Sequence, residues 1–224
     1  MRILCAIPAR GGSKRIPHKN RVDFAGKPLF LWTVYAALKC SFERIVVGTD
    51  DDVLFSQIPG SVSAHRRGAE SCSDSATVLD ATREMLFAYE RTDGKYDGVC
   101  ILLPTAPLRT SHDILRCLER FDGKNIVMAV SHYNLPPWQA LTLNGVPFWD
   151  TADRKGQQVP DLVCDAGSVY IINRDDLMNL KTLYSKELSL VEIPIERAVD
   201  IDDENTLSLA RTLARGLLYE ASYR

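Results

Sequence analysis

Four short stretches of this chain are apolar at nearly every position, and they limit its possible folds more than any other feature. They cover residues 2–8, 44–48, 97–103 and 125–131. A strand with one face in water alternates apolar and polar residues, whereas a strand covered by helices on both faces is apolar throughout. The four stretches therefore predict strands buried in a parallel sheet.

Helical signals lie between and after these strands. We expect helices over residues 28–40, 74–91, 111–121 and 204–219. Pro28 suits the first position of a helix, and Ser73 and Ser111 are good N-cap residue types. The apolar stripe of the last helix indicates that it packs on the sheet. The alternation predicts one α/β domain over residues 1–224, with ligands bound at the carboxyl ends of the strands.

One segment interrupts this alternation. Residues 132–165 contain four prolines, two glycines and short alternating pieces. We interpret 139–165 as an inserted hairpin arm. Because an apolar hairpin that projects from a domain needs a covering surface, we expect the arm to pair two subunits in a homodimer.

Composition excludes several classes of protein. The hydrophobic content of 46% and the charged content of 25% are typical of a globular protein. A net charge of −2 offers no general basic field, so we expect no nucleic-acid partner. No apolar stretch approaches the ~18 residues that span a bilayer, so we expect no membrane association and a cytoplasmic location. The six cysteines have no zinc-site spacing, and we expect reduced thiols.

A glycine-rich basic loop follows the first predicted strand. The sequence A-R-G-G-S-K-R-I-P-H-K-N-R fills residues 9–21, and the window 10–27 holds six basic residues and one acid. Adjacent glycines allow close backbone approach, and Arg10, Lys14 and an exposed Lys19 would neutralise a triphosphate. The loop matches neither the P-loop nor the dinucleotide-binding pattern. The alternative is a solvated basic turn.

A pair of alternating carboxylates precedes the last helix. Asp200 and Asp202 are two residues apart, so in an extended segment they face the same way. Magnesium takes one or two protein carboxylates and leaves its other positions to phosphate and water. The alternative is helix capping, which we expect for Asp203 and Glu204.

Two further segments follow extended pieces of the chain. P-T-A-P-L-R-T at 104–110 presents Thr105 and Arg109 at the same sheet edge, unless it is only a turn and a helix start. One of Arg66 and Arg67 would contact the base or a phosphate of a nucleotide, unless both face solvent.

These motifs together resemble the acylneuraminate cytidylyltransferase family, the CMP-sialic acid synthetases. The resemblance extends over nearly the whole chain, including G-K-P at 26–28 and V-V-G-T-D at 46–50. It implies a three-layer nucleotidyltransferase fold with a mostly parallel, Rossmann-like sheet and an arm that pairs two subunits. It implies that Asp200 and Asp202 bind Mg²⁺ or another divalent cation, and that Arg67 lies near the base. The implied CTP-binding residues of the loop are Arg10, Gly11, Gly12, Ser13, Lys14, Lys19 and Asn20.

The sugar-binding motifs differ from those of the sialic acid enzymes. Leu103 stands where the family has a glutamine, and C-D-A-G-S-V-Y at 164–170 is similar to the pseudaminic acid cytidylyltransferases. P-P-W-Q-A-L at 136–141 favours the same group. The resemblance implies sugar contacts from Thr105, Arg109, Gln139 and Asp165. We expect pseudaminic acid as substrate, with N-acetylneuraminic or legionaminic acid as the other nine-carbon candidates. A 3-deoxy-manno-octulosonate cytidylyltransferase is the alternative, although its loop lacks this G-G-S-K and K-N pairing.

The expected reaction transfers CMP from CTP to the anomeric hydroxyl of the sugar and releases pyrophosphate. Arg10, Lys14, Lys19 and Asp202 are the expected catalytic residues, through charge neutralisation and alignment. Two competing interpretations are a metal-dependent nucleotide-sugar glycosyltransferase, which also uses a D-x-D pair, and a nucleotide-binding module without activity.

Overall fold

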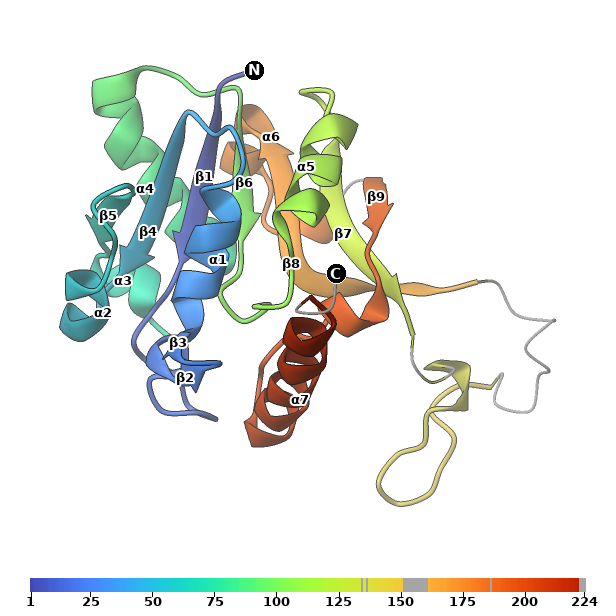
Figure 1. The fold of residues 1–224 in the computed structure, drawn as a ribbon. Coiled ribbons are helices and arrows are strands. Elements are labelled where there is room, and N and C mark those ends of the chain that lie inside the picture. Colours follow the sequence, from blue (N-terminus) through green and yellow to red (C-terminus); the bar gives the residue numbers. More distant parts are fainter. Residues whose placement is uncertain (134, 136, 151–160, 186, 222–224) are drawn as a thin grey trace.

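A seven-stranded sheet lies at the centre of the computed structural model, which describes residues 1–133, 135, 137–150, 161–185 and 187–221 (Figure 1). The strand order is β5-β4-β1-β6-β8-β7-β9. The strands are β1 (Ile3–Pro8), β4 (Arg44–Thr49), β5 (Ser63–Arg66), β6 (Gly98–Leu102), β7 (Ile126–His132), β8 (Val163–Asn173) and β9 (Leu188–Glu192). A separate antiparallel pair consists of β2 (Asp23–Phe24) and β3 (Lys27–Pro28). The four strands predicted from apolar stretches, β1, β4, β6 and β7, are confirmed.

Helices cover both faces of the sheet. The α-helices are α1 (Leu29–Ala37), α2 (Asp52–Ser56), α3 (Ala69–Cys72), α4 (Val78–Asp93), α5 (Ser111–Arg120), α6 (Arg174–Asn179) and α7 (Glu204–Ala221). Alternate residues of β1 enter two different cores: Cys5 packs with residues of α1 and α5, and Leu4 packs with residues of α4 and α6. This arrangement explains why β1 is apolar throughout, and it gives the expected three layers (Figure 1).

Strand β8 was not predicted, and it changes the sheet. It lies between β6 and β7 and is antiparallel to both, whereas the pairs β5–β4, β4–β1, β1–β6 and β7–β9 are parallel. Its first half contains Asp165, Gly167 and Ser168, and these residues hide the strand from a hydrophobicity pattern. The predicted arm therefore extended too far, because residues 163–165 belong to β8.

The described part of the arm begins with the 3-10 helix η2 (Pro137–Gln139). A small hairpin follows, in which Thr142 N–H donates to Val146 O (2.8 Å) and Phe148 N–H donates to Ala140 O (2.9 Å). It projects away from the sheet in Figure 1. Residues 151–160 of the predicted arm lie outside the described residues.

The helix caps differ from those predicted at Ser73 and Ser111. The N-caps of α4 and α5 are Thr77 and Thr110, and each forms a capping box with the aspartate three residues later. Ser73 instead ends the short helix α3, and Ser111 is the first residue of α5. The capping boxes satisfy more of the free N–H groups at each helix start than a lone serine would.

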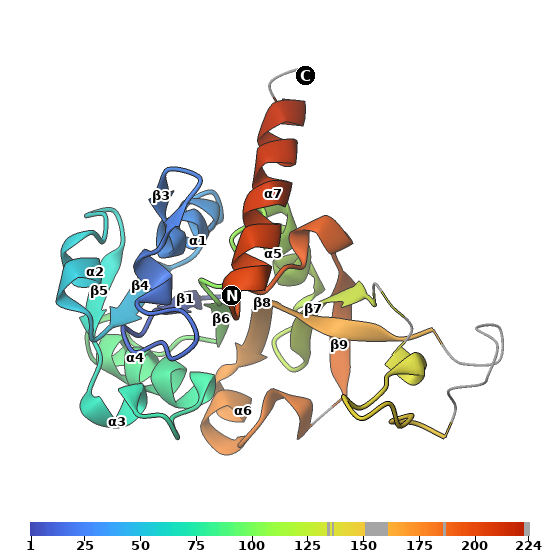
Figure 2. The same cartoon turned by 90° about the horizontal axis from the view of Figure 1, so that it is seen from below.

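Helix α7 does not pack on the sheet as expected. Its buried residues Leu207, Ala210 and Ala214 form a third core with Phe24 and Leu29. Figure 2 shows the helix extending beyond the sheet beside α1. This third core attaches the end of the chain to the segment that follows the glycine-rich loop.

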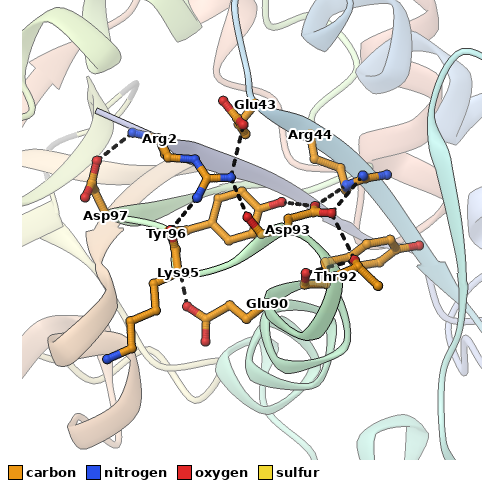
Figure 3. A network of polar contacts seen from close by, with 10 residues as sticks. Arg2, Glu43, Arg44, Glu90, Thr92, Asp93, Lys95, Tyr96 and Asp97 are labelled. Carbon is orange, nitrogen blue, oxygen red and sulfur yellow. Dashed lines mark hydrogen bonds and ion pairs between the residues drawn. The ribbon is translucent and has the colours of Figure 1, made fainter.

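A polar network fixes the amino ends of the central strands (Figure 3). Arg2 donates to the main-chain oxygens of Asp93 (2.8 Å) and Lys95 (2.9 Å), and Arg44 donates to the Asp93 carboxylate (3.0 Å). The Tyr96 hydroxyl also donates to Asp93. The hydrogen bonds from Arg44 and then from Tyr96 lower the pKa of Asp93 to about 2. The loop from α4 to β6 is thereby tied down at the edge opposite the one where a ligand is expected.

No helix among the described residues is both long and apolar enough to cross a lipid bilayer.

Candidate active site

A cleft of about 370 Å³ lies at the carboxyl ends of β1 and β6. Four segments line it: the loop after β1, the stretch from Arg67 to Ser71 in α3, the start of α4 and the turn after β6. Asp202, from just before α7, also reaches it. The carboxyl edge of the sheet is where an α/β fold places its ligands, so the cleft fits the predicted position. The predicted residues that line it are Arg10, Ser13, Lys14, Lys19, Asn20, Arg67, Thr105 and Asp202.

Two aspartates after β4 hold the glycine-rich loop in place. Gly11 N–H donates to the Asp50 carboxylate (2.7 Å), and Arg21 lies 2.7 Å from the Asp51 carboxylate. A Cβ atom on Gly11 would lie 2.9 Å from Cβ of Asp51, so only glycine fits there. Gly11 thus allows close packing against Asp51, and its N–H is already bonded to Asp50. Neither Gly11 nor Gly12 lines the cleft, in contrast to the expectation that their N–H groups face a ligand.

Arg10 and Lys14, at the rim of the cleft, form ion pairs with the exposed carboxylate of Asp74. Lys14 lies 2.8 Å and Arg10 3.9 Å from the Asp74 carboxylate. The Lys14 side chain is 77% exposed, and a surface ion pair of this kind contributes little stability. A phosphate could therefore replace Asp74 at small cost.

Lys19 is partly buried, although the loop predicted an exposed side chain. Only 13% of its side chain is accessible. Its ammonium group donates to Ile201 O (2.6 Å) and lies 3.3 Å from the Asp202 carboxylate. Arg15 lies 3.0 Å from the same carboxylate. The glycine-rich loop and the carboxylate pair are therefore joined directly.

Asp200 is more enclosed than Asp202. Burial raises the pKa of Asp200; a hydrogen bond from Thr105 opposes this, and the negative charge of Asp202 adds to it. Its Oδ1 atom is buried and has no hydrogen-bond partner in the described part of the chain. Ile201, between the two aspartates, is fully buried.

Helix capping does not account for this pair. Asp203 is the capping residue of α7, since its carboxylate accepts from Thr206 N–H (2.8 Å). Two hard oxygen donors, one of them with an unpaired atom, fit a divalent cation that completes its coordination with phosphate and water. No group of three or more His, Cys, Asp or Glu side chains that could hold a metal occurs among the described residues.

The predicted sugar contacts are not all brought together. Arg109 is 3% exposed and donates to Ser168 O (2.8 Å), Leu103 O (3.1 Å) and the Thr33 hydroxyl (2.5 Å). Burial lowers the pKa of Arg109 to about 10. Its guanidinium group holds the end of β6 against β8 instead of reaching the cleft. Gln139 is exposed on the arm, away from the cleft-lining residues.

Arg67 and Asp165 are both held by hydrogen bonds. Arg67 is 7% exposed and donates to the Ser71 main chain and, at 3.4 Å, to the Ser71 hydroxyl. Asp165 does not line the cleft; its carboxylate accepts hydrogen bonds from Gly167 N–H and from the hydroxyls of Tyr170 and Tyr184.

Several residues that line the cleft were not predicted from the sequence. Ser71, Ala76, Thr77 and Val78 line the wall next to Arg67. The T-x-x-D pattern at 77–80 would have located the start of α4, and with it this wall. No local pattern distinguishes Ser71 from the other serines of 71–75.

Comparison with known proteins decides the family. The cytidylyltransferase family model matches residues 4–132, more than half of the chain. The chain belongs to the cytidylyltransferase family. Among curated relatives, this cytidylyltransferase is 30% identical to the pseudaminic acid cytidylyltransferase of Campylobacter jejuni, covering 95% of this chain and 96% of the relative. It is 33% identical to the CMP-N,N'-diacetyllegionaminic acid synthase of Legionella pneumophila, covering 90% of this chain and 91% of the relative.

Solved structures support the same fold at lower sequence identity. A CMP:2-keto-3-deoxy-manno-octonic acid synthetase complexed with CTP has a TM-score of 0.69 and 18% identity, with 96% of this chain and 99% of that chain covered. A 4-diphosphocytidyl-2C-methyl-D-erythritol synthase from Anaerococcus prevotii has a TM-score of 0.67 and 11% identity, with 96% and 98% covered. At these identities the likeness shows the nucleotidyltransferase fold alone.

Proposed function

We propose that this cytidylyltransferase transfers CMP from CTP to the anomeric hydroxyl of a nine-carbon acidic sugar and releases pyrophosphate. The observation that carries the proposal is the contact of Lys19 with Ile201 O and Asp202, which joins a phosphate-type loop to the segment that carries the carboxylate pair; of the two aspartates, Asp202 lines the cleft and Asp200 does not. Membership of the family and two nearly full-length relatives named for such sugars support it.

The proposed mechanism rests on alignment and charge. When CTP binds, its phosphates replace the Asp74 carboxylate as the partner of Arg10 and Lys14. Lys19 is already held in the cleft by its hydrogen bond to Ile201 O. The anomeric oxygen of the sugar attacks the α-phosphorus, and the bond from that phosphorus to the pyrophosphate oxygen breaks. The cations stabilise the charge that develops on the phosphate oxygens. The hydroxyl proton passes to solvent, because no side chain lining the described cleft stands out as a general base.

We propose Asp200 and Asp202 as the ligands of Mg²⁺ or another divalent cation. When bound, such an ion supplies further neutralisation of the phosphates and lowers the pKa of the attacking hydroxyl. The unpaired Oδ1 of Asp200 supports this assignment.

Pseudaminic acid remains our preferred substrate. The D-A-G-S-V-Y sequence at 165–170 supports it, and so does the Campylobacter relative. The Legionella relative, of similar identity, keeps legionaminic acid as the second candidate. The octulosonate alternative has only a fold-level likeness behind it. Membership of the cytidylyltransferase family counts against the glycosyltransferase and against a module without activity.

The oligomer and the location also remain proposals. The hairpin exposes four large apolar side chains, Leu141, Leu143, Val146 and Phe148, which supports pairing of two subunits through the arm. A cytoplasmic location stays a prediction from the sequence.

The decisive experiment measures pyrophosphate release from CTP with pseudaminic, legionaminic, N-acetylneuraminic and 3-deoxy-manno-octulosonic acids in parallel. We expect turnover with a nine-carbon sugar and the highest kcat/KM with pseudaminic acid. Reactions without sugar, and with UTP or ATP in place of CTP, are the controls. Turnover with the eight-carbon sugar alone would replace the proposal by its alternative.

A further inference from the structure

A tight turn within β8 lies beside the proposed metal site. Asp165 Oδ1 accepts a hydrogen bond from Gly167 N–H (2.8 Å), which closes a turn over residues 165–167. Gly167 has a φ of +60°, in the left-handed region that favours glycine. The pairing of β7 with β8 also shifts register between Met128 and Val130, opposite this turn. The turn is therefore a built irregularity of the strand.

The side chain of Asp200 packs directly on this turn. A Cβ atom at position 167 would lie 2.9 Å from Asp200 Oδ2, 3.0 Å from Cγ and 3.1 Å from Cβ. Three atoms of one side chain would thus be within repulsive distance. Asp200 can keep its place only because position 167 has no side chain.

The carboxylate of Asp165 is held from two sides. The Tyr170 hydroxyl, on a side chain that is 5% exposed, lies 2.9 and 2.8 Å from its two oxygens. The Tyr184 hydroxyl, from the 3-10 helix η4 (Leu183–Ser185), donates to Oδ2 (2.5 Å). With Gly167 N–H, three donors serve two oxygens. The Asp165 carboxylate therefore has fewer lone pairs left to accept hydrogen bonds from a sugar than the predicted sugar contact requires.

We infer that Gly167 and Asp165 are positioning residues for Asp200: the turn over 165–167 forms the surface that fixes the Asp200 carboxylate. The inference rests on the proposed role of Asp200 in binding a divalent cation, and it reassigns Asp165 from the sugar to the support of that carboxylate. Supports of this kind change metal affinity without touching the metal.

The first test compares Gly167→Ala with Gly26→Ala. Gly26 has a φ of +83° and no atom within 4 Å of an added Cβ, so its variant also places a side chain on a backbone with positive φ, but without a clash. The readout is binding of Mn²⁺ to the protein–CTP complex by electron paramagnetic resonance, with the Mg²⁺ concentration for half-maximal turnover beside it. We expect Gly167→Ala to weaken Mn²⁺ binding about tenfold or more and Gly26→Ala to change it less than about twofold. Equal Mn²⁺ affinity in the two variants would overturn the inference.

A second pair of variants covers the case in which Gly167→Ala does not fold. Asp165→Asn keeps an acceptor for Gly167 N–H, whereas Asp165→Ala removes it. We expect weaker Mn²⁺ binding for the alanine variant and an affinity within about threefold of the native protein for the asparagine variant. If both variants instead raise the KM of the sugar and leave Mn²⁺ affinity unchanged, Asp165 is a sugar contact and the inference is wrong.

Asp200→Asn separates failure of the inference from failure of the metal assignment. Loss of Mn²⁺ binding in Asp200→Asn, with normal binding in Gly167→Ala, refutes only the positioning role. Normal Mn²⁺ binding in Asp200→Asn refutes the metal assignment and the inference with it.

Discussion

The ammonium group of Lys19 donates a hydrogen bond of 2.6 Å to the carbonyl of Ile201, 182 positions later in the chain. The same group lies 3.3 Å from the Asp202 carboxylate. One side chain therefore connects the loop that we assign to phosphate with the segment that we assign to metal. A change at Lys19 should affect both the stability of the protein and its chemistry.

Replacing Lys19 by alanine is the direct test of this connection. We expect Lys19→Ala to lower the free energy of unfolding by about 1–2 kcal/mol, because a charged donor is lost from a largely buried site. We expect kcat/KM for CTP to fall by about 100-fold or more, since we assign the same cation to the phosphates. Lys14→Ala is the control, because Lys14 is exposed and its ion pair contributes little stability. Urea unfolding and initial rates separate the two effects: Lys14→Ala should show the kinetic defect alone.

The carboxylate pair is tested by three asparagine variants. We expect Asp200→Asn and Asp202→Asn to lose most activity and to require more Mg²⁺, because the amide retains volume but not charge. Asp203→Asn should retain near-native activity and stability, since asparagine caps a helix about as well as aspartate. Turnover is titrated against Mg²⁺ for each variant while thermal unfolding is followed. Near-normal Mg²⁺ dependence in the first two variants would contradict the metal assignment.

The Asp93 network predicts a specific loss of stability in acid. The pKa of Asp93 is lowered from 3.8 to about 2 in the folded protein, so its ionised form is favoured by folding. Its contribution is fully present above pH 3.8 and is lost as the pH falls through about 2. Asp93→Asn should therefore be less stable than the native protein at neutral pH, and the difference should shrink as the pH falls below 3.8. Urea unfolding of both proteins across this range measures it. A constant difference would show that the charge of Asp93 is not what stabilises the loop.

The arm predicts a dimer that depends on its apolar side chains. Leu143 is fully exposed at the hairpin. If it is buried between subunits, Leu143→Glu should weaken dimerisation by about 2 kcal/mol or more, roughly 30-fold in the dissociation constant. Leu209→Glu is the control, because Leu209 is a half-exposed leucine on α7, away from the arm. Sedimentation at micromolar concentration distinguishes the species. A native protein that sediments as a monomer would contradict the prediction.

Sequence patterns identified the parts of this protein whose structure is determined by neighbouring residues in the chain. Buried parallel strands such as β1 are apolar throughout, and the glycine-rich loop is basic over a continuous window, so both were predicted. Strand β8 was not, because Asp165, Gly167 and Ser168 break the apolar pattern in its first half. Arg109 was assigned to the sugar because it follows a predicted strand in a family motif, yet two acceptors from distant segments, Ser168 O and the Thr33 hydroxyl, hold its guanidinium group. No sequence window contains those acceptors, so its burial depends on tertiary structure.

The position of β7 in the sheet affects how the chain can fold while it is being translated. In the part of the chain that the structure describes, its two neighbours, β8 and β9, both follow it in the sequence. The parallel strands β1, β4, β5 and β6 can pair with one another as soon as they leave the ribosome, whereas β7 must wait for Val163 and later residues. Until then an apolar strand and an unpaired edge of β6 are exposed together, a combination that favours aggregation. Translation of the segment between β7 and β8 is therefore the interval in which a chaperone would protect this protein most.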